Sequence, residues 1–140
     1  DVADWGYLTQ KGKRVYNARS ETLLEKPLFG KDFVQNRCVI PVTGFCEWDG
    51  DGTGWDFLPQ EEEMLYLAGV CRKKAEGWEA TVVTEHASGC VGEIHHRTPL
   101  ILSGENLRQW LYDEAQARQF LEEAKERVLL KRKKMEGETL

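Results

Sequence analysis

The centre of the chain carries two long apolar runs, at 64–71 and 78–84, separated by a short polar link. The first run is almost wholly apolar and the second is rich in β-branched residues, so they predict two long strands. Two shorter runs of the same kind, at 37–42 and 45–48, precede them, and helical spacing appears only near the C-terminal end. Strands first and helices last predict an α+β fold.

The segments around these runs complete the outline. Residues 1–13 are interpreted as loop, 20–25 as a short helix that Pro27 stops, and 49–54 as a turn. Towards the C-terminal end, apolar residues recur at helical spacing after a potential cap, Asp113. The residues of this pattern are Leu107, Trp110, Leu111, Ala117, Phe120, Leu121 and Ala124. We expect one domain, with its core at about 5–122 and a helix end or solvated tail at 123–140.

Composition excludes some classes of protein. The chain has 140 residues, of which 41% are hydrophobic and 31% charged, as expected for one soluble globular domain. No apolar run is long enough to cross a membrane. Four dispersed cysteines favour reduced thiols over a disulfide framework. The net charge of −5 argues against a basic coat for nucleic acid, although a local basic cleft is compatible with it.

Glu47 is the most informative single residue. It lies between aromatic residues in a strand that should be half-buried, on the face opposite Cys46 and Trp48. A carboxylate in that setting is either paired or has a raised pKa, and either state suits a general acid or base. The alternative, a solvent-facing or purely structural carboxylate, stays open at this point.

Two adjacent histidines, His95 and His96, end an irregular polar segment at 85–99. In extended chain their side chains point to opposite sides, so only one can face a given site. A surface or structural histidine is the competing interpretation. Together with His86 and Cys90 they do not match the spacing of a zinc site, so no metal is predicted.

The tryptophans and Cys46 allow further hypotheses. Trp78 and Trp110 occupy periodic positions and are predicted to be core, whereas Trp5 and Trp48 flank polar segments where an indole could stack on a base. Cys46 lies in a strand, away from the helix N-terminus or cation that activates a nucleophilic thiol. A thiol peptidase centred on it is therefore weakly indicated.

Taken in order, a series of short motifs resembles the SOS-response-associated peptidase (SRAP) family. They are Trp5-Gly6-Tyr7, Asn17-Ala18-Arg19 with Glu21-Thr22, Phe29, Arg37-Cys38, Gly44-Phe45-Cys46-Glu47-Trp48, Ala68-Gly69-Val70, Thr84 with Ala87, Ile94-His95-His96-Arg97-Thr98-Pro99, and Trp110-Leu111. The resemblance implies a compact β-rich α+β domain with C-terminal helices and a cleft for single-stranded DNA. It also implies covalent capture of abasic sites without a cofactor.

In the implied chemistry, the α-amine of an N-terminal cysteine forms a Schiff base with the ring-opened sugar, and the thiol closes a thiazolidine. Matched by position, Asn17 orients the amine. Glu47 assists ring opening and proton transfer, and His95 handles protons at the Schiff base. The implied DNA contacts are stacking or phosphate binding by Trp5, Arg19, Trp48 and Arg97.

The chain departs from the family at two kinds of position. Cys46 replaces a usual tyrosine, and His96-Arg97-Thr98 replaces Asp-Arg-Met. The family also has an N-terminal segment with the cysteine and several strands, absent from this chain. We predict that this segment exists as a separate chain, as a cleaved N-terminal fragment of the same protein or as a part of the protein outside this sequence, and that the chain alone cannot form the cross-link.

Three functions stay open at this point. Covalent trapping leads, and the alternatives are non-covalent binding of single-stranded or modified DNA and autoproteolysis by a thiol peptidase. The expected location is cytoplasmic in a bacterium and nuclear in a eukaryote.

Overall fold

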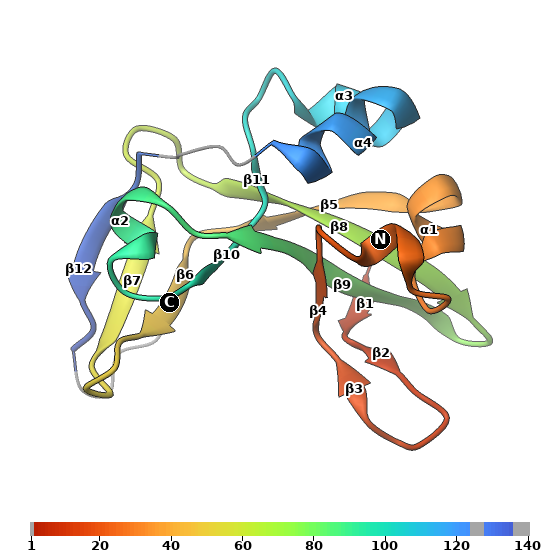
Figure 1. Ribbon diagram of the computed structural model, residues 1–140, viewed down its shortest axis with the longest axis horizontal. Helices are drawn as coiled ribbons and strands as arrows, with labels where there is room; N and C mark the ends of the chain where they lie inside the picture. Colours follow the sequence, from red (N-terminus) through yellow and green to blue (C-terminus); the bar gives the residue numbers. More distant parts are fainter. Residues whose placement is uncertain (1, 124–127, 136–140) are drawn as a thin grey trace.

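The computed structural model describes residues 2–123 and 128–135, and a long hairpin forms its centre (Figure 1). β8 (Leu65–Lys74) and β9 (Gly77–His86) pair in antiparallel fashion. The two long predicted strands are confirmed, and each continues past its apolar run into polar residues. The link between them is shorter than the sequence predicted and consists of Ala75 and Glu76. The turn can be this tight because Gly77 adopts a φ of +97°, which a glycine tolerates.

Within the described residues, β8 and β9 belong to a seven-stranded mixed sheet. β5 (Arg37–Val42) and β11 (Ile101–Leu102) run antiparallel to β8. β10 (Arg97–Pro99) runs antiparallel to β9, whereas β1 (Ala3–Trp5) and β4 (Asn17–Arg19) run parallel to it. The strand predicted at 37–42 is therefore confirmed.

The N-terminal residues differ from the predicted loop at 1–13. β1 lies there, and β2 (Tyr7–Leu8) pairs with β3 (Arg14–Val15) in a second small hairpin. Strands of two or three residues are too short to show a period of two. They are extended because distant partner strands satisfy their backbone groups, which local sequence does not reveal.

A separate small sheet contains β6 (Phe45–Trp48), β7 (Gly54–Leu58) and β12 (Leu130–Lys133) in the order β12-β7-β6. β6 and the turn before β7 were predicted correctly. The helix end or tail predicted at 123–140 is wrong for residues 130–133. They form a strand because β7 offers a pairing edge, and buried Asp56 on β7 attracts the basic side chains.

Five short helices are described. They are η1 (Leu23–Glu25), α1 (Gly30–Gln35), α2 (Gly89–Gly92), α3 (Leu107–Tyr112) and α4 (Glu114–Glu122). Asp113 caps α4 as predicted, since its side chain accepts a hydrogen bond from the Gln116 amide. The helix predicted at 20–25 shortens to the single 3₁₀ turn η1, α1 was missed, and Ala124 lies outside the described residues.

The two faces of the large sheet carry different clusters. Val83 belongs to the main core, which contains Phe33, Trp110 and Phe120 from the helices. Its neighbour Val82 points to the other face, into a smaller cluster with Leu67. The helices α1, α3 and α4 therefore cover one face of the large sheet. In the described part of the chain, no helix has the length and apolar character needed to cross a membrane.

Candidate functional site

The face of the sheet opposite the helices forms one wall of a cavity of about 1010 Å³, which we call the groove. Side chains from both sheets line it. Those used below are Trp5, Asn17, Cys38, Glu47, Cys71 and Trp78. Most of the remaining wall is aliphatic, so water in the groove is in contact with few polar groups. Such an apolar cavity with a few convergent polar groups is the usual form of a binding site.

Glu47 and His95 form a pair at this groove. Glu47 lies in β6, and His95 follows α2; Oε2 of the carboxylate is 3.6 Å from Nε2 of the imidazole. Both side chains are half-buried. Burial raises the pKa of Glu47, although the charge of His95 and the Trp48 amide oppose this effect. Glu47 is therefore paired with His95, in agreement with the first of the two states expected of a carboxylate in an apolar strand.

The backbone of Arg97 contacts Nδ1 of His95 from two groups, because both its amide nitrogen and its carbonyl oxygen lie 3.1 Å from this ring nitrogen. The role of Nδ1 as donor or acceptor therefore depends on the tautomer of the ring. In the tautomer in which Nδ1 accepts from the Arg97 amide, the proton lies on Nε2, facing Glu47. The pair can pass one proton between a carboxylate and an imidazole.

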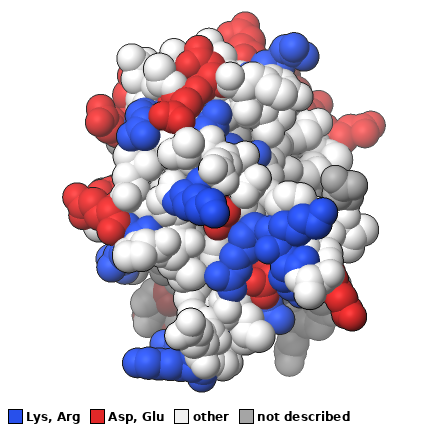
Figure 2. Space-filling view, turned by 90° about the vertical axis from the view of Figure 1, so that its right-hand side faces the viewer, with Lys and Arg blue, Asp and Glu red and all other residues white. Residues whose placement is uncertain are grey.

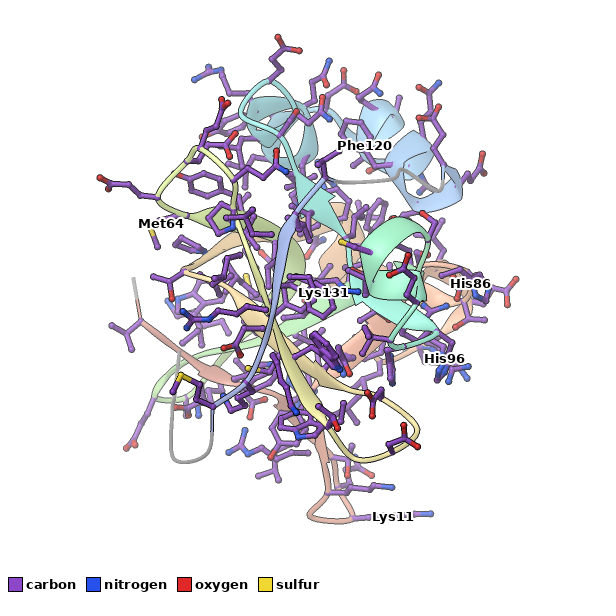
Figure 3. All side chains as sticks on the ribbon, turned by 90° about the vertical axis from the view of Figure 1, so that its left-hand side faces the viewer. Lys11, Met64, His86, His96, Phe120 and Lys131 are labelled. Atoms are coloured by element: carbon purple, nitrogen blue, oxygen red, sulfur yellow. The ribbon has the colours of Figure 1, made fainter. Side chains whose placement is uncertain are left out.

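His95 and His96 are not arranged as predicted. The chain turns at this point instead of continuing extended, and the two rings lie 4.6 Å apart at an angle of 32°. His96 is exposed, and Figure 3 shows it pointing outwards on the same side of the molecule as His86. Only His95 contacts Glu47 in the described residues.

Asn17 lies on the groove face of β4. It pairs in register with Val82, while the adjacent Ala18 is buried on the other face. Arg19, two residues along the strand, is exposed and shares the side of Asn17. The groove thus brings Asn17 from the large sheet towards Glu47 from the small one.

Trp5 and Trp48 are both largely exposed, at 60% and 53%. Trp5 lines the groove, and its indole N–H donates to the Tyr16 carbonyl at 3.0 Å, which holds the ring in place. Trp48 is the last residue of β6 and lies opposite Gly54. Both side chains are thus more than half exposed to solvent, although the Trp5 ring also packs edge-to-face against Tyr16 at 5.0 Å.

Arg97 is placed differently from the other predicted site residues. Its side chain is only 10% exposed, and the guanidinium donates to Glu21 and to the carbonyl and hydroxyl of Thr84 at 2.9–3.0 Å. These partners occupy both terminal nitrogens of the guanidinium, whereas Nε is buried and has no hydrogen-bond partner in the described part of the chain. The geometry makes Arg97 a structural arginine that fixes β10, immediately after His95.

Cys46 does not have the environment of a nucleophile. Its thiol donates to Asp56 at 3.0 Å and lies 3.5 Å from the ammonium of Lys134. Burial and the neighbouring carboxylate raise the pKa of this thiol. A raised pKa reduces the thiolate fraction, so the arrangement does not favour a thiol peptidase.

Sequence patterns missed part of the groove wall. Trp78 was predicted to be core but lines the groove. Alternation along β9 could have revealed this, because Trp78 and Val82 share one face and buried Glu79 lies on the other. Among the described residues, no three His, Cys, Asp or Glu side chains converge as metal ligands.

Comparison with known proteins decides the family. The model of the family described as SOS response associated peptidase (SRAP) matches residues 2–136. The chain belongs to the SRAP family. The predicted resemblance is confirmed, and so is the α+β fold, since a crystal structure from Bordetella bronchiseptica superimposes with a TM-score of 0.81 over 95% of this chain and 76% of that one, at 23% identity.

Curated SRAP relatives carry names that describe an activity. "Abasic site processing protein YoqW" of Bacillus subtilis is 32% identical over 79% of this chain and 53% of its own length. "Abasic site processing protein HMCES" of Gallus gallus is 34% identical over 68% of this chain and 37% of its own length. The chain thus spans about half, or less, of the curated relatives it matches.

Proposed function

We propose that this chain is part of a protein that processes abasic sites in single-stranded DNA, with Glu47 and His95 moving protons in the groove. The observation that carries the proposal is the 3.6 Å contact between these two side chains at the groove. Support also comes from the SRAP relatives named as abasic site processing proteins.

The proposed chemistry is covalent capture. The ring-opened abasic sugar has an aldehyde, and an α-amine adds to it and loses water to form a Schiff base. A neighbouring thiol then adds to the imine carbon and closes a thiazolidine. Ring opening and loss of water each need a proton donor and an acceptor, and a carboxylic acid with a raised pKa serves both roles near neutral pH.

Each further residue has a proposed part. His95 exchanges a proton with Glu47 through Nε2, and Asn17 orients the amine. Trp5 and Trp48 stack on bases beside the lesion, and Arg19 attracts a phosphate. Arg97 acts indirectly, because its bonds to Glu21 and Thr84 hold the segment that presents His95.

Amine and thiol are both assigned to an N-terminal cysteine in the segment that the family has before the first motif. We propose that this segment belongs to the same protein, either continuous with the chain or as a separate fragment. The chain described in this structure supplies the proton carriers and the DNA-binding wall.

The test uses full-length protein and single-stranded DNA with one abasic site. Covalent product is measured on a denaturing gel for the unmodified protein, for Glu47→Gln and for His95→Ala. Each change is expected to slow trapping by about 10²–10⁴-fold, the usual contribution of a positioned proton carrier. His96→Ala is the matched control, because it removes an exposed histidine from the same segment and leaves the His95–Glu47 ion pair in place.

The outcomes separate the alternatives. Salt-sensitive binding with no gel-stable product, even in the unmodified protein, would establish a non-covalent DNA binder instead. Loss of trapping on Cys46→Ser, with unchanged folding, would restore the thiol peptidase hypothesis. Equal rates for Glu47→Gln and His96→Ala would refute the proton-carrier role of Glu47.

A further inference from the structure

Two of the four cysteines face each other across neighbouring strands in the groove wall. Cys38 on β5 pairs in register with Gly69 on β8, and Cys71 lies two residues further along β8. Residues two apart in a strand share a face, so both thiols point to the same side. Both also line the groove, which makes them accessible to small molecules in solution.

Gly69 leaves room between the two sulfurs. A Cβ atom at this position would lie 3.0 Å from Sγ of Cys38, so the sulfur occupies the space above the glycine that a side chain would fill. Cys71 is anchored from its other side, where its thiol lies 3.4 Å from the Asn36 carbonyl. The Cys38 thiol therefore lies above Gly69, on the same face of the sheet as the Cys71 thiol.

Each thiol alters the acidity of the other. Hydrogen bonding with Cys71 raises the pKa of Cys38, with burial as a second cause, and the same interaction lowers the pKa of Cys71. A neighbouring thiol stabilises a thiolate in the same way in redox-active cysteine pairs. Cys71 is thereby suited to attack a disulfide, and Cys38 to resolve the product.

We propose that Cys38 and Cys71 form a redox-active dithiol that closes reversibly to a disulfide by exchange with a small-molecule disulfide such as oxidised glutathione. The thiolate of Cys71 attacks one sulfur of glutathione disulfide and releases one glutathione thiolate. Cys38 then loses its proton and attacks Cys71 in the mixed disulfide, releasing the second glutathione. Two protein thiols and one disulfide become one protein disulfide and two glutathione thiols.

The strand geometry makes the bond reversible. Diagonal neighbours in an antiparallel pair are about 7–8 Å apart, at or just beyond the span of an ordinary disulfide. Closing the bond thus requires β5 and β8 to shift locally, and such disulfides are the readily reduced ones. The proposal concerns the groove wall and stands whether or not the abasic-site function holds.

The experiment equilibrates the full-length native protein in glutathione buffers from fully reduced to fully oxidised. Acid stops exchange, free thiols are alkylated, and peptides are mapped by mass spectrometry. We expect a peptide pair linked through Cys38 and Cys71 in oxidising buffers, lighter by two hydrogen atoms, that disappears in reducing buffers. Cys46 and Cys90 should stay available to alkylation.

Two variants sharpen the test. Cys38→Ser should convert Cys71 to a mixed disulfide with glutathione, because the resolving thiol is missing. Cys90→Ser, the matched control, should leave the linked pair unchanged. The proposal is overturned if the unmodified protein shows no Cys38–Cys71 link at any ratio, or shows it only in urea together with links to Cys46 and Cys90.

Discussion

Replacing Glu79 by glutamine is expected to loosen the β2–β3 hairpin from the large sheet. The Glu79 side chain is 3% exposed and binds two guanidinium groups. Arg14 lies 3.0 Å from Oε2, and Arg72 lies 2.8 Å from Oε1. The same carboxylate accepts from the Leu8 amide at 3.2 Å. One side chain of β9 therefore holds both strands of the hairpin that follows Trp5.

The expected loss of folding stability in Glu79→Gln follows from these contacts. Charge-assisted hydrogen bonds contribute about 1.5–3 kcal/mol each, and we take the lower end because Arg14 and Arg72 are about one-third exposed and can turn to water. Two such bonds give about 3 kcal/mol, or a fall of about 10 °C in melting temperature for a chain of this size. A glutamine also places an amide N–H against one of the guanidinium groups.

The pH dependence has a defined sign. Burial alone would raise the pKa of Glu79, but the hydrogen bonds from Arg72 and the Leu8 amide, with the charge of Arg72, hold it below its ordinary value. A lowered pKa adds stability above the unfolded-state value, near pH 4.3, and this stability is lost as the pH falls through the lowered value. The difference in free energy of unfolding between Glu79→Gln and the unmodified protein should therefore be largest at pH 7 and decrease in acid.

The assay is urea unfolding at several pH values, together with hydrogen exchange at the Leu8 amide. Glu76→Gln, at the exposed turn of the same β8–β9 hairpin, removes the same charge and should change stability by less than about 0.5 kcal/mol. This control is needed because a change in net charge by itself also alters stability. Figure 2 shows many Lys and Arg side chains on the face that it draws, which is the right-hand side of Figure 1. The reasoning would be refuted if Glu79→Gln and Glu76→Gln lowered the free energy of unfolding equally. It would also be refuted if the difference between Glu79→Gln and the unmodified protein did not change with pH.

Three further predictions concern single buried groups. Glu47→Gln should raise the melting temperature at pH 7, because burial raises the pKa of Glu47 and its ionised form therefore opposes folding. In melting curves measured over a range of pH, this increase should vanish below about pH 4, where the carboxyl is protonated in both the folded and the unfolded state. Trp110→Phe should cost about 1–3 kcal/mol in urea unfolding, since the indole N–H donates to the Cys38 carbonyl at 2.9 Å inside the core. Asp56→Ala should cost about 1–3 kcal/mol and increase hydrogen exchange along β12, because Asp56 is fully buried against the basic residues there.

Local patterns predicted the elements that are long enough to show a period. β8 and β9 follow from their apolar runs, and α4 follows from its cap and helical spacing. β1 and β12 were missed for the opposite reason, since each is short and exposed and depends on a partner far away in the sequence. Pairing across such distances leaves no local periodicity to detect.

In the candidate site, too, sequence identified the residue with a local signal and missed the contacts that depend on distant parts of the chain. Glu47 could be identified because a carboxylate in an apolar strand is costly unless it is paired. Its partner could not be derived from spacing, because His95 reaches it only through the packing of α2 against the small sheet. Arg97 was assigned to the DNA surface by its position in the family motif, and sequence cannot distinguish an arginine bonded to its own fold from an exposed one.

The position of Glu47 depends on contacts well outside the groove. Asn17 belongs to the large sheet and Glu47 to the small one, so the distance between them is set by how the two sheets are held. β12 helps to fix this distance, because Lys131, labelled in Figure 3, forms an ion pair with Glu93 at 2.9 Å. The next residue, Arg132, forms an ion pair with Asp56 on β7 at 3.4 Å. Lys131, Arg132 and Lys134 of the basic C-terminal run are thus paired with carboxylates of the protein itself. If the chain binds DNA as proposed, attraction for the phosphate backbone comes from exposed groups such as Arg19. A neutral substitution at Arg19 should then weaken binding in a titration with single-stranded DNA without moving Glu47.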